Sequence, residues 1–322
     1  MRRIVLWTVV LLLTTAAVAD AAVVSYTDKL NRTVDIPVPV RRAVFLQMYE
    51  FLPAMDIWDK VVGVASWAYR SDFIRAARPD IESFPSAGMG GEANIESILQ
   101  LHPDLVLTWA VRPESIRFME EKGIRVIAVY PETIPELYEV MRLLGRIFQQ
   151  EAQLKAAIAE MESIFSLVRE RAAKRGAGQK QKMVYLGGQS NSVACGLGIN
   201  NDLLQMIGGV NPAASIPKRD SLVSLEQLVV WNPEVIFIWG SAGYTAEDIM
   251  DNPQWRFIRA VRERRVYKLP RWSTWSPRLA LVALLMAKEA YPDEYRDIDL
   301  TQVADRFYQK LFGIPYQPEK TP

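Results

Sequence analysis

The sequence predicts an α/β protein made of two parallel-sheet lobes that are bridged by one long α-helix. Three observations lead to this prediction. Short runs of β-branched and aromatic residues alternate with helical patterns along the chain. A segment of the first half recurs in the second half at a fixed offset. An apolar stripe with helical spacing lies between the two copies. The length of 322 residues agrees with two domains.

Seven short apolar runs are expected to form buried strands, and helical patterns separate most of them. This alternation is typical of parallel sheets, because a helix returns the chain to the start of the next strand. The first lobe is predicted to contain strands at 43–46, 61–64, 105–107 and 126–129, and the second lobe strands at 183–186, 235–238 and 265–269.

The repeat consists of residues 94–109 and 224–239, which align without a gap at an offset of 130. Each copy begins with a polar residue that suits a helix N-cap and carries a glutamate in the first helical turn, Glu96 or Glu226. Proline, an acidic residue and a strand that ends in tryptophan follow in both copies. Helix–proline–strand order is common in α/β proteins, but agreement at this many positions is more specific and indicates two related lobes.

A long helix is predicted between the lobes, within the segment 135–174. A continuous helix from 151 to 174 would be roughly 36 Å long at 1.5 Å per residue. A coiled-coil seam for dimerisation is the alternative, but about three heptads are too few for that signal, so we expect contact with both lobes. The stripe consists of Leu154, Ala157, Ile158, Met161, Ile164, Phe165 and Val168.

The composition excludes several classes of function. Lys and Arg total 38 and Asp and Glu total 37, so no basic excess exists for a nucleic-acid backbone. With one histidine and one cysteine, the chain cannot build a metal site of several imidazoles or thiolates, nor an internal disulfide. We expect Cys195 to be a buried small apolar residue. We expect His102 to be a hydrogen-bonding group at a helix end, because its repeat partner is Asn232.

The first 19 residues have the layout of a cleaved secretory signal. Two arginines follow Met1, an apolar run covers 4–13, and small residues at 17–19 precede Asp20. A transmembrane helix needs about 20 apolar residues, so an uncleaved membrane anchor is the weaker alternative. Without a cysteine near the cleavage site, we expect a periplasmic protein that is not lipid-anchored. The predicted organisation is a signal peptide at 1–19, a first lobe at 20–134, a bridging helical segment at 135–174 and a second lobe at 175–322.

Several motifs together resemble one known family. The opening, 26–37, is similar to a pattern Asp-x-x-Gly-Arg-x-Val-x-Ile-Pro, with Asn31 in place of the glycine. The strand at 61–64, the two glutamate repeats, and 276–278 and 297–300 near the end follow in the matching order. Across the mature chain, these features resemble the periplasmic solute-binding proteins of ABC importers for iron–siderophore, haem and cobalamin.

The resemblance implies that the protein is a monomer, not an enzyme, and has no intrinsic cofactor. Such a protein hands its ligand to a permease dimer and its ATPase in the inner membrane. One glutamate on each lobe docks onto permease arginines in this family, and the matching positions are Glu96 and Glu226. Arginine binds a carboxylate bidentately, which fixes orientation as well as adding attraction. Alternatively, each glutamate only stabilises its helix dipole, by about 0.3–1 kcal/mol; the two roles are compatible.

The ligand is expected between the lobes, outside the carboxyl ends of the strands. Aromatic residues follow nearly every predicted strand, which favours a broad, partly apolar ligand held by stacking. We predict a metal chelate, an iron–siderophore complex in the first place, with haem or a corrinoid such as cobalamin as the alternative. Trp239 is expected to belong to the core. The predicted ligand-binding residues are Tyr49, Trp67, Arg70, Trp109, Arg112, Gln189, Tyr244, Trp272 and Trp275.

Other classes of function fit the sequence less well. A Ser–His–Asp hydrolase would have to use His102, and no Gly-x-Ser-x-Gly elbow surrounds any serine. A receptor for free zinc or manganese normally needs several histidines. No catalytic or metal-ligating residue is therefore predicted. A ligand sensor that contacts a membrane partner without transport remains an alternative, because it would share the docking surface.

The signal sequence generates the first testable prediction. Expressed in a Gram-negative host, the protein should accumulate in the periplasmic fraction with a mature N-terminus near Asp20 or Ala22. N-terminal sequencing of the purified protein checks this result. Retention of Met1 in a membrane fraction would show that the segment is an anchor instead.

Overall fold

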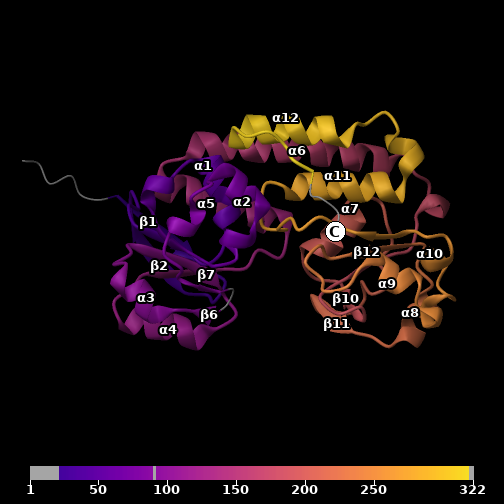
Figure 1. Cartoon of the computed structure of the whole chain (residues 1–322), viewed down its shortest axis with the longest axis horizontal. Coiled ribbons are helices and arrows are strands. Elements are labelled where there is room, and N and C mark those ends of the chain that lie inside the picture. The colour runs from indigo at the N-terminus through magenta and orange to yellow at the C-terminus, as the bar shows by residue number, and fades with distance from the viewer. Residues whose placement is uncertain (1–21, 90–91, 319–322) are drawn as a thin grey trace, which may run out of the picture.

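The computed structural model describes residues 22–89 and 92–318 and contains two α/β lobes that lie side by side (Figure 1). The predicted signal peptide lies outside the described residues. One long helix, α6 (Glu151–Ala173), reaches from one lobe to the other, as the sequence predicted. Helices α11 (Leu279–Ala290) and α12 (Leu300–Phe312) pack beside it.

The first lobe is built on a four-stranded parallel sheet in the order β4-β3-β7-β8. Its strands follow the predicted runs: β3 (Ala43–Phe45), β4 (Val61–Val64), β7 (Leu105–Trp109) and β8 (Val126–Val129). The antiparallel pairs β1 (Val23–Thr27) with β2 (Thr33–Pro37) and β5 (Gly88–Met89) with β6 (Glu92–Ala93) were not predicted. The helices of this lobe are α1 (Leu52–Met55), α2 (Asp72–Ala77), α3 (Ile95–Gln100), α4 (Pro113–Glu121) and α5 (Ile134–Phe148).

The second lobe contains a five-stranded mixed sheet in the order β11-β10-β9-β12-β13. Strands β9 (Met183–Leu186), β12 (Val235–Ile238) and β13 (Val266–Lys268) are parallel and match the prediction. Strands β10 (Ser192–Ala194) and β11 (Asp220–Leu222) are antiparallel and were missed, because three residues are too few to show an alternating pattern. The helices of this lobe are α7 (Ile199–Met206), α8 (Leu225–Trp231), α9 (Ala246–Met250) and α10 (Arg259–Arg262).

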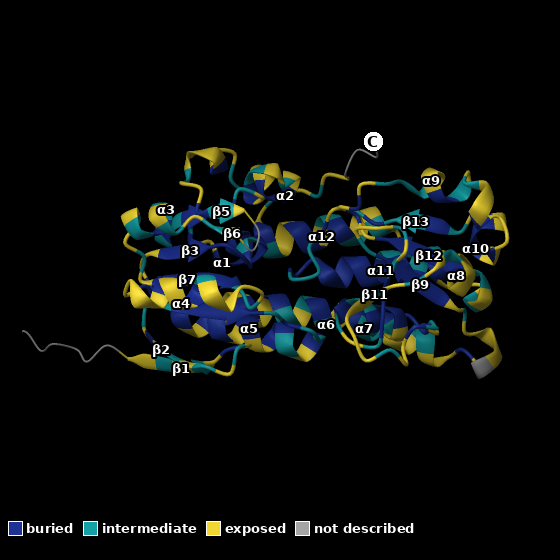
Figure 2. Ribbon diagram, turned by 90° about the horizontal axis from the view of Figure 1, so that it is seen from below, coloured by how far each residue is buried: buried dark blue, intermediate teal, exposed yellow. Residues whose placement is uncertain are grey.

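The segment predicted as one bridge contains two helices. The side chain of Thr133 caps α5, and Gln149 adopts a left-handed conformation (φ 59°) that ends it before α6 begins. Six residues of the predicted α6 stripe are buried, and Ile158 is partly buried. The helix contacts α1, α5, α7, α11 and α12, so the chain itself covers the stripe. In Figure 2, β3, β9 and α11 are drawn mostly in the dark blue of buried residues.

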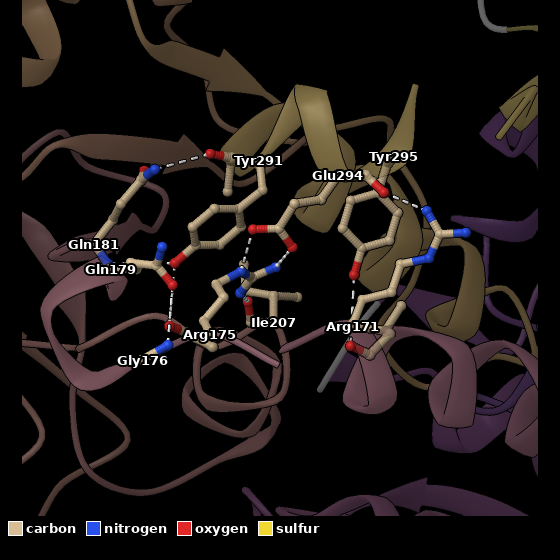
Figure 3. A network of polar contacts seen from close by, with 12 residues as sticks. Arg171, Arg175, Gly176, Gln179, Gln181, Ile207, Tyr291, Glu294 and Tyr295 are labelled. Carbon is tan, nitrogen blue, oxygen red and sulfur yellow. Dashed lines mark hydrogen bonds and ion pairs between the residues drawn. The ribbon is translucent and has the colours of Figure 1, made fainter. Parts of the chain in front are cut away.

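Ion pairs attach the C-terminal end of α6 to the second lobe (Figure 3). Just beyond the helix, Arg175 donates two hydrogen bonds to Glu294, at 2.7 and 2.8 Å, from Nε and Nη2. Its guanidinium also lies 3.3 Å from the centre of the Tyr291 ring. Within the last turn of α6, Arg171 binds both carboxylate oxygens of Asp297 at 2.7 Å. These contacts fix the helix to the turn that links α11 and α12.

The pair of Arg171 and Asp297 predicts a pH dependence of stability. Hydrogen bonding to Arg171 lowers the pKa of Asp297 from 3.8 to about 2. A depressed carboxyl pKa adds stability above the unfolded pKa, and this is lost as the pH falls from about 4 to about 2. The melting temperature of Asp297→Asn should therefore lie below that of the wild type at pH 6, and the gap should close near pH 2. Asp293→Asn, on the same exposed turn, is the control, and an equal gap at both pH values would contradict the assignment.

Candidate functional site

A cleft of about 520 Å³ lies between the lobes and is lined by residues of both. Residues that follow β3, β4, β7 and β8 form one wall, and residues that follow β9, β12 and β13 contribute to the other. This is the carboxyl edge of each parallel sheet, where open α/β proteins bind their ligands. Within this cleft the structure places five of the predicted residues, namely Tyr49, Trp67, Trp109, Trp272 and Trp275.

Aromatic rings from both lobes form a continuous row in the cleft. The centroid of Trp109 lies 5.9 Å from Trp67 and 5.6 Å from Trp275, in edge-to-face geometry. The ring of Tyr130 lies 4.7 Å from Trp275. The indole Nε1 of Trp275 also donates a hydrogen bond of 2.9 Å to the carbonyl of Pro131. Trp275 therefore connects its loop in the second lobe to the first lobe at the edge of the cleft.

Trp239 also lines the cleft, so the prediction that it belongs to the core was wrong. It is 39% exposed. After β12 the chain turns at Gly240, where a Cβ would lie 2.1 Å from the carbonyl oxygen of Pro270. A Cβ on Gly188, which follows the neighbouring strand β9, would lie 3.8 Å from the Trp239 ring. Because Gly188 has no side chain, nothing at that position covers the indole.

Four other predicted residues do not line the cleft. Arg70 is exposed beyond β4, and Arg112 forms an ion pair of 3.0 Å with Glu92 on the surface. The hydroxyl of Tyr244 donates to the carbonyls of Gly187 at 2.8 Å and Gln189 at 3.3 Å, so it holds the loop after β9. Gln189, in the same loop, is exposed to solvent.

The two tyrosines among the predicted ligand-binding residues, Tyr49 and Tyr244, have raised pKa values. Burial raises the pKa of Tyr49, and nearby Glu50 raises it further. Burial also raises the pKa of Tyr244. Both phenols are therefore neutral at physiological pH, and each carries an O–H that can donate a hydrogen bond; Tyr49 does so from the cleft lining. Among the described residues, no group of three or more His, Cys, Asp or Glu is placed to hold a metal ion.

Charged residues in the cleft come partly from segments that the sequence analysis missed. Arg219 and Asp220, at the start of β11, line the second-lobe wall, and Arg271 follows β13. The guanidinium of Arg219 lies 4.3 Å from the centre of the Tyr130 ring and 3.4 Å from a carboxylate oxygen of Glu132. Arg219 reaches the cleft because β11 pairs with β10, more than twenty residues earlier in the chain. Local sequence patterns do not reveal such a long-range pairing.

A buried ion pair lies at the inner end of the cleft. Arg278 donates to both carboxylate oxygens of Glu50, at 2.7 Å and 3.2 Å, and its third nitrogen lies 3.2 Å from the hydroxyl of Tyr308. The guanidinium also stacks 4.4 Å from the centre of the Phe73 ring. Although burial alone would lower it, the pKa of Arg278 is raised by Glu50 and Tyr308. The pair joins the first lobe to the start of α11.

The two glutamates of the repeat occupy equivalent exposed positions. Glu96 lies in the first turn of α3 and Glu226 in the first turn of α8. The helices are capped by Asn94 and Ser224, and both end at left-handed residues, His102 (φ 44°) and Asn232 (φ 46°). These are the helix ends that the sequence predicted for His102 and its partner. Figure 1 shows α3 and α8 in different lobes, each on the side away from α6. Cys195 is buried, as predicted.

The family is identified by a model that describes a periplasmic binding protein and matches residues 43–271. The chain belongs to this family. Its members are solute-binding proteins, not enzymes, which agrees with a cleft between two lobes. No helix in the described ranges has the length and apolar character to cross a bilayer.

The proteins similar to this chain are named for, or bound to, different ligands. The molybdate-binding protein MolA of Haemophilus influenzae is 27% identical, over 94% of both chains. Its molybdate-bound structure has a TM-score of 0.80, with 92% of this chain and 99% of that chain covered. Helicobacter pylori CeuE with Ni(II) bound is 28% identical, with a TM-score of 0.82 over 91% and 97% of the two chains. The Fe(3+)-citrate-binding protein YfmC of Bacillus subtilis is 26% identical over 73% of this chain and 75% of its own.

The buried pair of Arg278 and Glu50 generates a stability prediction. Glu50→Ala leaves a buried arginine without its carboxylate, which costs about 3–5 kcal/mol of unfolding free energy. The double variant Glu50→Leu/Arg278→Met should recover most of that loss, because no unpaired charge remains. Urea unfolding of each variant measures the difference. Glu92→Ala, which breaks the exposed pair with Arg112, is the control and should cost less than about 1 kcal/mol. An equal cost for Glu50→Ala and Glu92→Ala would contradict the buried role.

Proposed function

We propose that the protein is the periplasmic substrate-binding component of an ABC importer and that it captures a metal chelate, in the first place an iron–siderophore complex. The observation that carries this proposal is the row of aromatic rings contributed by both lobes to one cleft. Flat rings provide stacking area for the organic part of a chelate. Arg219 and Arg271, which line the same cleft, provide positive charge for carboxylates or phenolates.

A bare metal cation is the weaker ligand for this site. Glu50 is neutralised by Arg278, and Glu132 binds both Lys29 and Arg219. The lining therefore offers few free carboxylates to a cation, and it contains no histidine. A cleft of about 520 Å³ is within the range of roughly 300–1,000 Å³ that encloses a small organic ligand. Haem and a corrinoid such as cobalamin are the alternative ligands for the same cleft.

A metal oxoanion is a second candidate ligand. The relative that covers 94% of this chain is named for molybdate. A tetrahedral oxoanion needs hydrogen-bond donors and positive charge more than it needs stacking area. Arg219, Arg271 and the indole and amide N–H groups of the cleft wall meet that need. The two candidates differ in the role of the aromatic rings. The rings would stack on the organic part of a chelate, whereas around an oxoanion they would only exclude water.

Ligand titration tests the proposal directly. One ferric siderophore should bind per chain and quench tryptophan fluorescence strongly, because Trp67, Trp109, Trp239 and Trp275 line the cleft. The titration is repeated with haem, cobalamin and molybdate to rank the alternatives. Small-angle scattering should show little compaction on binding, because α6 is a continuous helix attached to both lobes. Binding of a small polar solute with a large compaction, and of none of these ligands, would contradict the proposal.

The docking of the protein onto a permease dimer is the second part of the proposal. The carboxylates of Glu96 and Glu226 are exposed on equivalent helices, so two anionic groups face outward from the two lobes. A two-fold permease with an arginine pocket on each subunit would match them. A hydrogen bond from its own backbone N–H lowers the pKa of Glu226, which keeps it charged.

Charge reversal tests the docking role. Glu96→Arg with Glu226→Arg should abolish uptake in cells that carry the cognate permease, while the ligand Kd stays within about two-fold, because neither residue lines the cleft. The matched control reverses Glu121 and Glu247, which are exposed on α4 and α9. That control should transport normally. Normal uptake by the first double variant would remove the docking role.

A further inference from the structure

Two hydrogen-bond donors in the cleft have no partner within the described part of the chain. They are Nε2 of Gln47 and the indole Nε1 of Trp109, and both atoms are buried. Both residues line the cleft, and Gln47 is only 5% exposed. A buried donor without an acceptor costs about 1–3 kcal/mol, so buried donors are almost always paired. Two such donors in one wall require an explanation.

The strand register brings the two donors together. In the parallel pair of β3 with β7, Phe45 lies opposite Leu107. Gln47 and Trp109 each follow two residues later, and the backbone N–H of Gln47 still bonds to the carbonyl of Leu107 at 3.3 Å. Neighbouring strands lie about 4.8 Å apart, so both side chains leave adjacent strand ends at the same level. The register therefore places the two side chains next to each other in the first-lobe wall of the cleft.

The chemistry of the pair defines what it can bind. An indole is a donor only, so Trp109 requires an acceptor and fixes the sense of the hydrogen bond. Glu50, the cleft carboxylate three positions after Gln47, already accepts from Arg278. The rings of Trp67 and Trp275 flank Trp109, but an aromatic face is a weak acceptor that does not replace oxygen. The missing partner is therefore an acceptor that no described residue provides.

We infer that Gln47 and Trp109 form a donor pair that binds metal-bound oxygen atoms of an anionic ligand. This inference rests on the proposed function, because it concerns the same cleft. The ligand then lies with its oxygens against the first-lobe wall, while Arg219 and Arg271 face it with positive charge from the second lobe. Both a metal oxoanion and a chelate wrapped in carboxylate oxygens carry this chemistry.

Calorimetric titration of variants tests the donor pair, with molybdate and ferric citrate as the two probes. Trp109→Phe keeps a ring but removes the N–H, and Gln47→Met keeps the length but removes the donors. Each should weaken binding about ten-fold or more, since hydrogen bonds to charged groups are worth about 1.5–3 kcal/mol. Gln47→Glu, which adds negative charge, should weaken it further. Trp58→Phe, at a tryptophan that does not line the cleft, is the control and should change the affinity for either probe less than about two-fold. Thermal melting of each variant confirms that it is folded.

The outcomes separate this inference from the proposed function. If the Kd values of Trp109→Phe and Gln47→Met for a probe that the wild type binds stay within about two-fold of the wild-type value, the donor pair is wrong and the proposed function stands. If neither oxygen-rich probe binds but Ni2+ alone or haem does, the donor pair is also wrong. If no metal complex or oxoanion binds at all, both are wrong. If the two variants lose affinity for molybdate only, or for ferric citrate only, the donor pair is supported. The probe affected then shows whether the bound oxygen atoms belong to an oxoanion or to a chelate.

Discussion

The attachment of α6 to both lobes is the constraint on which the ligand cleft depends. One end of the helix contacts α1 and α5 in the first lobe, and the other is held by Arg175 on Glu294 and Arg171 on Asp297. The buried pair of Glu50 with Arg278 adds a second connection at the inner end of the cleft. Because the helix is continuous, the lobes cannot separate widely without breaking these contacts. The cleft is therefore largely formed before a ligand arrives, and binding energy is not spent on lobe closure.

Local patterns in the sequence were sufficient for the frame of the molecule. The apolar runs that became β4, β8, β9 and β12 were bounded correctly, because a buried parallel strand is continuously apolar and ends at polar or turn residues. The stripe of α6 was predicted for a similar reason. The repeat predicted that His102 and Asn232 occupy equivalent helix ends, and the structure adds that both residues are left-handed. The family was recognised from the order of these elements.

The parts that the sequence did not predict depend on contacts between distant residues. Strands β10 and β11 bring Ser192 and Arg219 into the cleft, but each is three residues long. Glu50 and Arg278 are 228 positions apart, so their pairing leaves no local pattern. The positions that follow the strands include five residues of the cleft. Position alone could not separate Trp109, which lines the cleft, from Arg112, which lies three residues further along the chain and pairs with Glu92. Trp239 was misassigned because the space above Gly188 is a tertiary feature.

Native mass spectrometry of the protein purified from its own periplasm tests the central claim most directly, because it weighs whatever occupies the cleft. The account predicts one additional mass per chain, with the isotope pattern of a metal and the mass of an oxygen-rich chelate or oxoanion. The fraction of the protein that carries this mass should fall in the Trp109→Phe variant when it is purified in the same way. A metal-free neutral solute in the cleft, such as a sugar, would contradict the account.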